Sequence, residues 1–164
     1  MKSSDLPEIV ELNDFGGDYD EYIDHIYSIF YEDVVDKKLY FRGEELKLKW
    51  NPIFQEKAYT FYHITHQGED EANRTPDLRR CERMSWLRPT VTNCDKWNLK
   101  VFEQKRGSKV RLCIWLEMID EFDYFVIIDV RSNYKLLWTA FVAEYPHQIR
   151  AKQREYEEWL KRKK

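Results

Sequence analysis

The sequence predicts an α+β protein, with N-terminal helices followed by a mainly antiparallel four- to five-stranded sheet and a C-terminal helix. Before residue 37, apolar residues recur at three- and four-residue steps, which is typical of an amphipathic helix. After residue 98, β-rich runs are separated by short turns, which favours an antiparallel meander. The length of 164 residues suits one domain with its own hydrophobic core, and no repeat or linker divides it. We therefore expect a single domain over residues 1–164.

Charge is distributed unevenly along the chain. Residues 1–36 hold one basic and eleven acidic residues, a net charge of −10, so we expect an acidic leader and helix there. The remaining residues hold 26 basic and 19 acidic residues, a net charge of +7. A basic body of this kind is compatible with a nucleic-acid enzyme, and equally with ordinary solubility.

The cysteine pattern and the absence of long apolar runs bear on location. Cys81, Cys94 and Cys113 are odd in number and not closely paired, which argues against a disulfide framework and for a reducing compartment. No apolar run reaches the length of a membrane span, and no signal-peptide pattern opens the chain. We therefore expect a cytoplasmic protein that does not contact the membrane.

The N-terminal third is predicted to contain a loose leader, a helix and a hairpin. Gly16 and Gly17 end the leader, and Asp18 is placed to cap a helix over residues 18–36. His25 lies among acidic residues of this helix and is expected at the surface. A hairpin is expected over residues 39–50, because its second arm alternates strictly.

The middle of the chain is predicted to form a strand, a polar loop and a helix. Alternation over residues 58–66 favours a strand, which would place His63 and His66 on opposite faces. Loop 67–75 follows. Pro76 then suits the first turn of a helix, with Thr75 as its cap.

This helix should end near residue 88, because Arg88 and Pro89 stop or kink it, and a second helical piece is expected to about residue 93. The expected later elements are strands over residues 99–104, 110–118, 124–130 and 134–144, and an amphipathic helix over 146–164.

Three arginines of the predicted middle helix form the first candidate site. Arg79 and Arg83 are four residues apart, and Arg80 and Arg83 are three apart. These spacings bring their guanidinium groups together on one side of a helix. Like charges repel, so such a cluster is easiest to understand if it faces an anion, and the planar guanidinium suits a phosphate. With two histidines nearby, the pattern suggests RNA phosphodiester chemistry. The alternative is a solvated basic helix face with two polar histidines.

We also considered a metal site. His63 and His66, with Cys81 and Cys94, could offer two nitrogens and two sulfurs to zinc. The cysteines form no close pair and the histidines alternate on the predicted strand, so we expect no metal and no cofactor. The sequence also has no glycine-rich phosphate loop and no serine elbow.

Four segments together resemble prophage-encoded members of the BECR ribonuclease superfamily, which includes barnase, EndoU, the colicin tRNases and RelE-type toxins. They are F-Y-H-I-T-H (61–66), P-D-L-R-R-C-E-R-M-S-W-L-R-P (76–89), I-W-L-E (114–117) and Y-K-L-L-W-T-A-F (134–141). The resemblance covers roughly residues 58–155 and would make residues 58–164 a nuclease core. It does not account for the acidic helix or the N-terminal hairpin.

The resemblance implies a metal-independent endoribonuclease of the phage or toxin-effector type. The ribose 2′-hydroxyl would attack the adjacent phosphorus and leave a 2′,3′-cyclic phosphate. Such a reaction needs an acid, a base and cations at the phosphorane. The implied catalytic residues are His63 and His66 as acid or base, Arg80 and Arg83 at the phosphate, and Thr139 as a hydrogen-bond donor. The implied substrate-binding residues are Arg79, Trp86, Tyr145 and His147. The partners expected are RNA and, for a toxin, a protein inhibitor or antitoxin.

Two other functions remain open at this stage. One is a non-catalytic RNA-binding module on the same fold, and the other is a protein-interaction module that uses the acidic arm or an aromatic surface. Each candidate residue also has a structural alternative: His63 as a satisfied histidine of a sheet, Thr139 as an ordinary strand residue, and Trp86 as a buried residue at a helix end.

Overall fold

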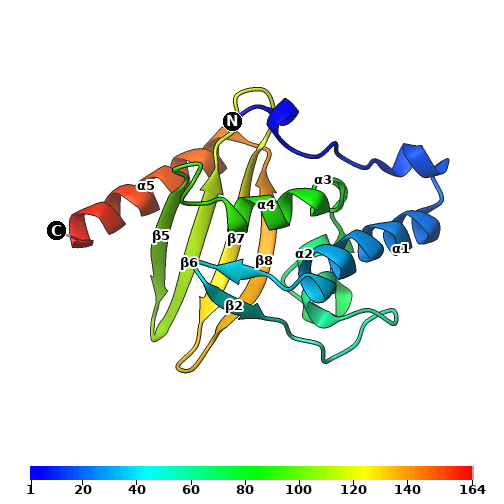
Figure 1. The fold of residues 1–164 in the computed structure, drawn as a ribbon, viewed down its shortest axis with the longest axis horizontal. Coiled ribbons are helices and arrows are strands. Elements are labelled where there is room, and N and C mark those ends of the chain that lie inside the picture. The colour runs from blue at the N-terminus through cyan, green and yellow to red at the C-terminus, as the bar shows by residue number, and fades with distance from the viewer. Residues whose placement is uncertain (164) are drawn as a thin grey trace.

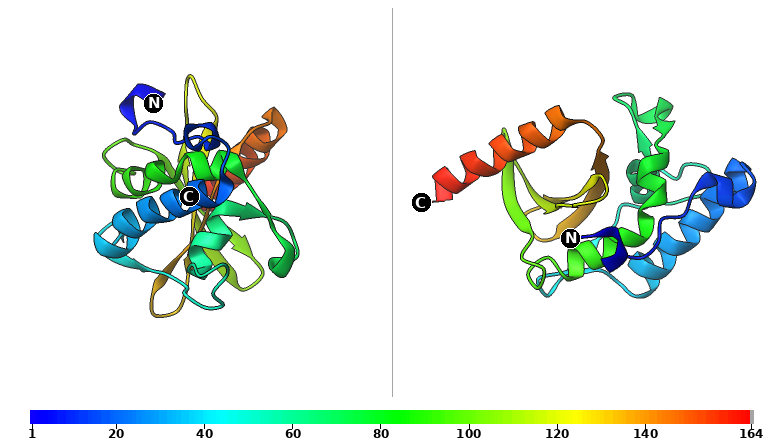
Figure 2. Two further views of the ribbon diagram at one scale, coloured as in Figure 1. Left: turned by 90° about the vertical axis from the view of Figure 1, so that its right-hand side faces the viewer. Right: turned by 90° about the horizontal axis from the view of Figure 1, so that it is seen from above.

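The computed structural model describes residues 1–163, with the backbone alone for Ala72, and has a curled sheet with helices on both faces (Figures 1 and 2). The helices are α1 (Tyr19–Phe30), α2 (Tyr59–Thr65), α3 (Leu78–Glu82), α4 (Leu87–Thr92) and α5 (Pro146–Lys163). The main strands are β1 (Tyr40–Phe41), β2 (Glu44–Lys47), β5 (Lys100–Arg106), β6 (Lys109–Leu116), β7 (Asp123–Val130) and β8 (Lys135–Ala143). A small pair consists of β3 (His66–Gln67) and β4 (Thr75–Pro76).

The α+β class and the order of helices, sheet and C-terminal helix are confirmed, but the sheet is larger than expected and mixed. Its strand order is β1-β2-β8-β7-β6-β5, with six strands. The N-terminal hairpin joins the meander because β2 pairs in parallel with β8, through Leu46↔Lys135 and Lys47↔Leu136. The expectation of a four- to five-stranded sheet is therefore wrong, because alternation identifies a strand without specifying the partner beside which it pairs.

The predicted helix at residues 18–36 is confirmed. The Asp18 side chain accepts a hydrogen bond from the Glu21 backbone N–H and caps α1. The helix buries Tyr22, Ile23, Ile26 and Phe30 and continues into a π-helical turn over Tyr31–Asp36. The leader before it lies on the body, where the Val10 carbonyl accepts a hydrogen bond from the Tyr22 hydroxyl at 2.7 Å.

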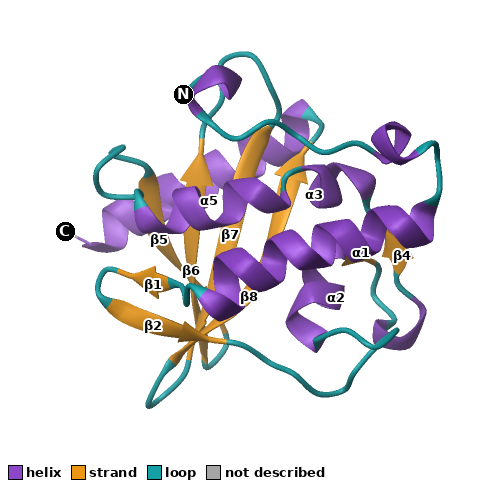
Figure 3. Ribbon diagram, turned by 45° about the vertical axis from the view of Figure 1, so that its right-hand side comes forward, coloured by secondary structure: helices purple, strands orange, loops and turns teal. Residues whose placement is uncertain are grey.

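Residues 58–66 were predicted as a strand, and this prediction is wrong because residues 59–65 form the helix α2. Every residue of α2 is buried, so no face is marked by exposed polar side chains. The apparent alternation arose from polar and apolar residues that are all inside the protein, and tertiary packing overrode the strand preference of aromatic and β-branched residues. The helix packs against β8 (Figure 3).

The helix predicted from Pro76 is shorter than expected. Thr75 and Pro76 form β4, which pairs with β3, so neither caps nor begins the helix. Asp77 is the cap residue of α3, which ends at Glu82. A 3-10 turn over Met84–Trp86 leads into α4.

Pro89 lies in the first turn of α4 and does not end the helix there. The backbone N–H groups of a first turn have no intrahelical acceptor, so a proline in that turn removes no helical hydrogen bond. The expected second helical piece is present, but begins at Leu87 and ends at Thr92.

The meander β5–β8 is confirmed as antiparallel throughout. Helices α1 and α4 cover one face of the sheet, which we call the outer face, and α5 covers part of the other, the inner face (Figures 2 and 3). The larger core lies under the outer face, and the smaller is an aromatic cluster between the inner face and α5. The inner cluster comprises Phe102, Cys113, Trp115, Phe125, Ile127 and Ala143, with Trp138, Phe141, Ile149, Tyr156 and Trp159 packed against it.

Helix α5 is confirmed over residues 146–163; Lys164 lies outside the described residues. None of the helices found within residues 1–163 has both the length and the apolar character needed to cross a membrane.

The cap of α1 is testable. Replacing Asp18 by Ala should lower the free energy of unfolding by about 1 kcal/mol, because the Glu21 N–H loses its acceptor, whereas Asp18→Ser should retain most of the stability. Asp20→Ala is the matched control at an exposed position of the first turn. Urea unfolding measures the difference, and equal losses in the Ala and Ser variants of Asp18 would contradict the capping role.

Candidate functional site

Arg83 lies inside the protein. Its side chain is only 2 % exposed and forms ion pairs with Glu82 at 3.0 Å and Glu121 at 2.8 Å. The same guanidinium donates a hydrogen bond to the Arg79 carbonyl and lies over the rings of Trp86 and Phe122. The charge of Arg83 is therefore matched by internal carboxylates.

The other two arginines of the segment also have carboxylate partners. Arg79 Nη2 lies 2.8 Å from Glu82 Oε2, and Arg80 Nε lies 3.2 Å from Asp77 Oδ2. The helix α3 is only five residues long, and acidic residues lie at its start and end. The three guanidinium groups consequently have acidic neighbours within the protein, a feature that the arginine spacing alone did not reveal.

Three of the predicted substrate-binding residues lie in other environments. Trp86 is buried, and its indole N–H donates to the Pro7 carbonyl at 2.8 Å, so its ring is covered by protein rather than offered to a base. Tyr145 and His147 are exposed, and their rings stack on each other beyond the C-terminal end of β8. Tyr145 lines a separate surface hollow there.

His66 occupies a structural position. It is buried, its ring stacks on Tyr62, and its Nδ1 lies 3.1 Å from the Tyr62 carbonyl oxygen and 2.9 Å from the Thr65 hydroxyl. Burial lowers the pKa of His66 below its ordinary value. The His66 carbonyl accepts a hydrogen bond from Arg80 at 2.9 Å, which ties α3 to the end of α2.

His63 and Thr139 are brought together from distant parts of the chain. The Thr139 hydroxyl donates to the His63 carbonyl at 3.4 Å, and the His63 ring lies 4.8 Å from the ring of Trp138. His63 is 7 % exposed, and its Nδ1 is buried without a hydrogen-bond partner. An unpartnered ring nitrogen of this kind is available to a ligand that reaches it.

The environment of His63 keeps its ring neutral. Burial is the main cause that lowers the pKa of His63 to about 4, and the positive charges of Arg74, Arg80 and Arg111 contribute to the same shift. A backbone hydrogen bond with Trp138 acts in the opposite direction.

Sequence reasoning did not select Arg74 and Arg111. Arg74 comes from the polar loop, and its Nε is buried without a hydrogen-bond partner. Arg111 lies in β6, with its guanidinium 4.7 Å from the Trp138 ring. Nothing local in the sequence distinguished these two arginines, because only strand register and the loop path bring them to His63.

The strand register places a row of mainly polar side chains across the inner face of the sheet. Arg111 and Asp129 are each two residues from an inner-face residue of their own strand, so they share that face. The paired positions in this row are Lys47↔Leu136, Leu136↔Asp129, Asp129↔Arg111 and Arg111↔Gln104. Buried Asp129 pairs with Arg131 at 2.6 Å and with Arg111 at 3.7 Å.

A hollow of about 460 Å³ continues this row past the end of β2. Its lining includes Lys47, Lys49, Arg131 and Tyr134. The Lys49 ammonium lies 4.4 Å from the Tyr59 ring, and that ring lies 5.8 Å from His63. We call the six basic residues of this region the cationic cluster: Lys47, Lys49, Arg74, Arg80, Arg111 and Arg131.

The cysteines are poor candidates for nucleophiles. All three are free and buried. Burial raises the pKa values of Cys81 and Cys113 to about 12 each, and raises that of Cys94 as well. In the part of the chain that the structure describes, no three His, Cys, Asp or Glu side chains are grouped so that they could hold a metal ion.

Comparison with known proteins gives no family assignment. No protein-family model, no curated protein and no solved structure matches the chain.

The lowered pKa of His63 predicts a pH-dependent stability. The unfolded chain binds this proton near pH 6.5, whereas the folded protein binds it only near pH 4. His63 therefore contributes stability that is complete above pH 6.5 and is lost as the pH falls, up to about 3 kcal/mol. His63→Gln should reduce the loss measured by urea unfolding, and exposed His25→Gln should behave as the parent does. A full loss in His63→Gln would contradict the assignment.

The burial of Arg83 predicts a large effect on stability. Replacing Arg83 by Met should lower the free energy of unfolding by about 3 kcal/mol, because buried Glu82 loses a partner. The matched control is Arg79→Met, since that side chain is 42 % exposed and should contribute less than about 1 kcal/mol. Similar losses in the two variants would show that Arg83 is not the main internal counter-charge.

Proposed function

We propose that the protein is a metal-independent endoribonuclease that binds single-stranded RNA along the cationic cluster. The observation that carries the proposal is the convergence of Arg74, Arg80 and Arg111 on a neutral histidine with an unpartnered ring nitrogen. Guanidinium groups suit phosphate oxygens, and a neutral imidazole can accept a proton.

In the proposed reaction His63 is the base. Its Nδ1 takes the proton of the ribose 2′-hydroxyl, whose oxygen attacks the adjacent phosphorus. The bond from phosphorus to the 5′-oxygen breaks, that oxygen takes a proton from solvent, and a 2′,3′-cyclic phosphate remains. The arginines stabilise the additional negative charge on the phosphorane.

Bound RNA would itself make His63 more basic. The positive charges that lower the pKa of His63 belong to the same side chains that would hold the phosphate. A phosphate between them compensates those charges, so the imidazolium costs less free energy with substrate than without it. The same arginines would thus bind the substrate and set the pKa of His63.

The roles of the other predicted residues change accordingly. Thr139 acts as a positioning residue through its hydrogen bond to the His63 carbonyl. Arg83, His66 and Trp86 are assigned to the packing that supports α2 and α3, because all three are buried with internal partners.

A non-catalytic RNA-binding module is the second candidate. The small exposure of His63, 7 %, is the observation that favours it, since a base must reach the 2′-hydroxyl. The two functions predict the same contribution of the arginines to affinity and differ only in cleavage.

Cleavage of end-labelled single-stranded RNA in EDTA tests the proposal. The parent should give fragments that end in cyclic phosphate, and His63→Gln should reduce the rate by about 10²-fold or more while RNA affinity is retained. Arg74→Gln should weaken binding and reduce the slope of log affinity against log salt by about 0.7. The matched control is Arg154→Gln, at an exposed position on α5.

Each outcome has a defined meaning. Salt-dependent binding without cleavage by the folded parent would reject the enzyme in favour of the binding module. Binding that is equally strong in Arg74→Gln and Arg154→Gln would reject the cationic cluster as the RNA site. Thermal unfolding of every variant separates loss of function from loss of fold.

A further inference from the structure

The strand β5 is an open edge of the sheet. It is the last strand in the order, with β6 as its single neighbour. The Glu103 carbonyl points away from β6, because it lies 3.5 Å from Arg162 Nη2 of α5, a distance at the limit for a hydrogen bond. Alternate residues of an antiparallel strand direct their backbone N–H and C=O groups to the same side. The backbone groups of Val101 and Lys105 therefore also point away from β6. The edge therefore presents backbone donors and acceptors to an additional strand.

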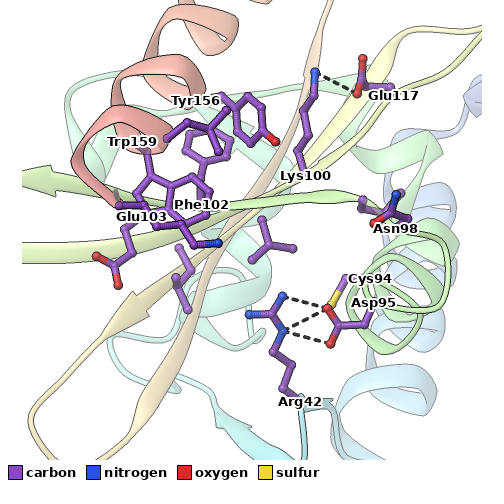
Figure 4. A pocket seen from close by; sticks show the side chains of 15 residues that line it. Arg42, Cys94, Asp95, Asn98, Lys100, Phe102, Glu103, Glu117, Tyr156 and Trp159 are labelled. Atoms are coloured by element: carbon purple, nitrogen blue, oxygen red, sulfur yellow. Dashed lines mark hydrogen bonds and ion pairs between the residues drawn. The ribbon is translucent and has the colours of Figure 1, made fainter.

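A pocket of about 530 Å³ runs along this edge (Figure 4). On one side it is lined by Tyr156 and Trp159 of α5, with Phe102 beneath them. On the opposite side lie Arg42, from the turn between β1 and β2, and Asp95, which are joined by a 2.8 Å ion pair. Successive side chains of an added strand point to opposite faces, so one set would meet the aromatic side and the other the Arg42 side.

The charges around the edge favour an acidic partner. The exposed residues Lys105, Arg106 and Lys109 lie at the β5–β6 turn, and Arg162 and Lys163 extend from α5 beside it. Among residues 1–163, none of these five side chains forms an ion pair, whereas Lys100 nearby is paired with Glu117 at 3.1 Å. Glu103 and Glu158 of the same region also form no ion pair among the described residues, so five basic residues against two acidic ones leave an excess of positive charge. A strand that carries carboxylates would balance this excess.

A second copy of the chain fits this edge poorly. If two β5 strands paired antiparallel about Glu103, Lys100 would face Arg106 of the other copy, and the two Glu103 side chains would face each other. Like charges placed directly across a strand pair destabilise it. Self-pairing therefore places like charges opposite each other at Lys100, Glu103 and Arg106, which a partner strand of different sequence avoids.

We propose that the β5 edge is a docking site for an extended acidic segment of a partner protein, which adds to the sheet as a seventh strand. The backbone of the segment pairs with the outward groups of β5, and apolar side chains of one face lie against Tyr156 and Trp159. Its carboxylates lie beside the five basic residues named above. This site shares no residue with the cationic cluster, of which Arg111 in β6 pairs with Gln104 of β5.

A labelled short peptide that alternates valine with glutamate is the probe, and a peptide that alternates valine with lysine is its control. Fluorescence anisotropy should show binding of the acidic peptide alone, with protection of the Val101, Glu103 and Lys105 amides from hydrogen exchange. Glu103→Pro should weaken binding at least about tenfold. A proline there removes an outward N–H and leaves the β5–β6 ladder unchanged.

A second variant keeps the test valid if the proline disturbs the strand. Arg106→Glu combined with Arg162→Glu should also weaken binding at least about tenfold. The charge-matched control is Arg150→Glu combined with Arg154→Glu, because both residues are exposed and line neither pocket. Three results would overturn the proposal: no binding up to about 1 mM, equal binding of both peptides, or loss of binding in Arg74→Gln. The last result would place the peptide in the cationic cluster.

Discussion

The fold depends on what covers the edge of strand β8 that faces away from β7. One edge of this strand pairs with β7 along its whole length, but β2 covers only the beginning of the other. Helix α2 lies against β8, and the Thr139 hydroxyl donates to a carbonyl of that helix. A buried strand edge needs either another strand or a cover, because unpaired backbone groups inside a protein are costly. Helix α2 covers part of this edge and brings His63 beside Trp138.

An irregularity in the sheet lies at the same place. The register between β7 and β8 shifts at Ile127 and Ile128, so that Trp138 is an additional residue of β8. Bulges bend a strand and redirect its side chains. Here the bulged residue Trp138 contacts both His63 and Arg111. The candidate site is therefore formed at this bulge, by residues from one loop, two helices and two strands.

The arginines divide into two groups by the partners that the fold provides. Arg83 is enclosed with Glu82 and Glu121, and it stabilises the junction of α3 with the loop before β7. The buried Nε of Arg74 has no hydrogen-bond partner among the described residues, and Arg111 shares Asp129 with Arg131. The two proposed sites use this difference, because incompletely matched charges lie near His63, beside the interior strand β8, and along the open edge of β5. In both proposals the ligand is negatively charged, but the first site offers guanidinium groups around His63 and the second a strand edge beside Tyr156 and Trp159.

The sequence by itself determined the class of the fold, the helix capped by Asp18, the four strands of the meander and the C-terminal helix. These elements carry local signals, since periodicity, caps and turns act over a few residues. It also singled out His63 and Arg80, which the site retains. Only the tertiary structure decided that residues 59–65 form a helix, that β2 joins β8 in parallel, and that Arg83 is buried while Arg74 and Arg111 reach His63. Each of these features depends on contacts between residues far apart in the chain, and the spacing within one segment holds no information about a partner that only folding brings near.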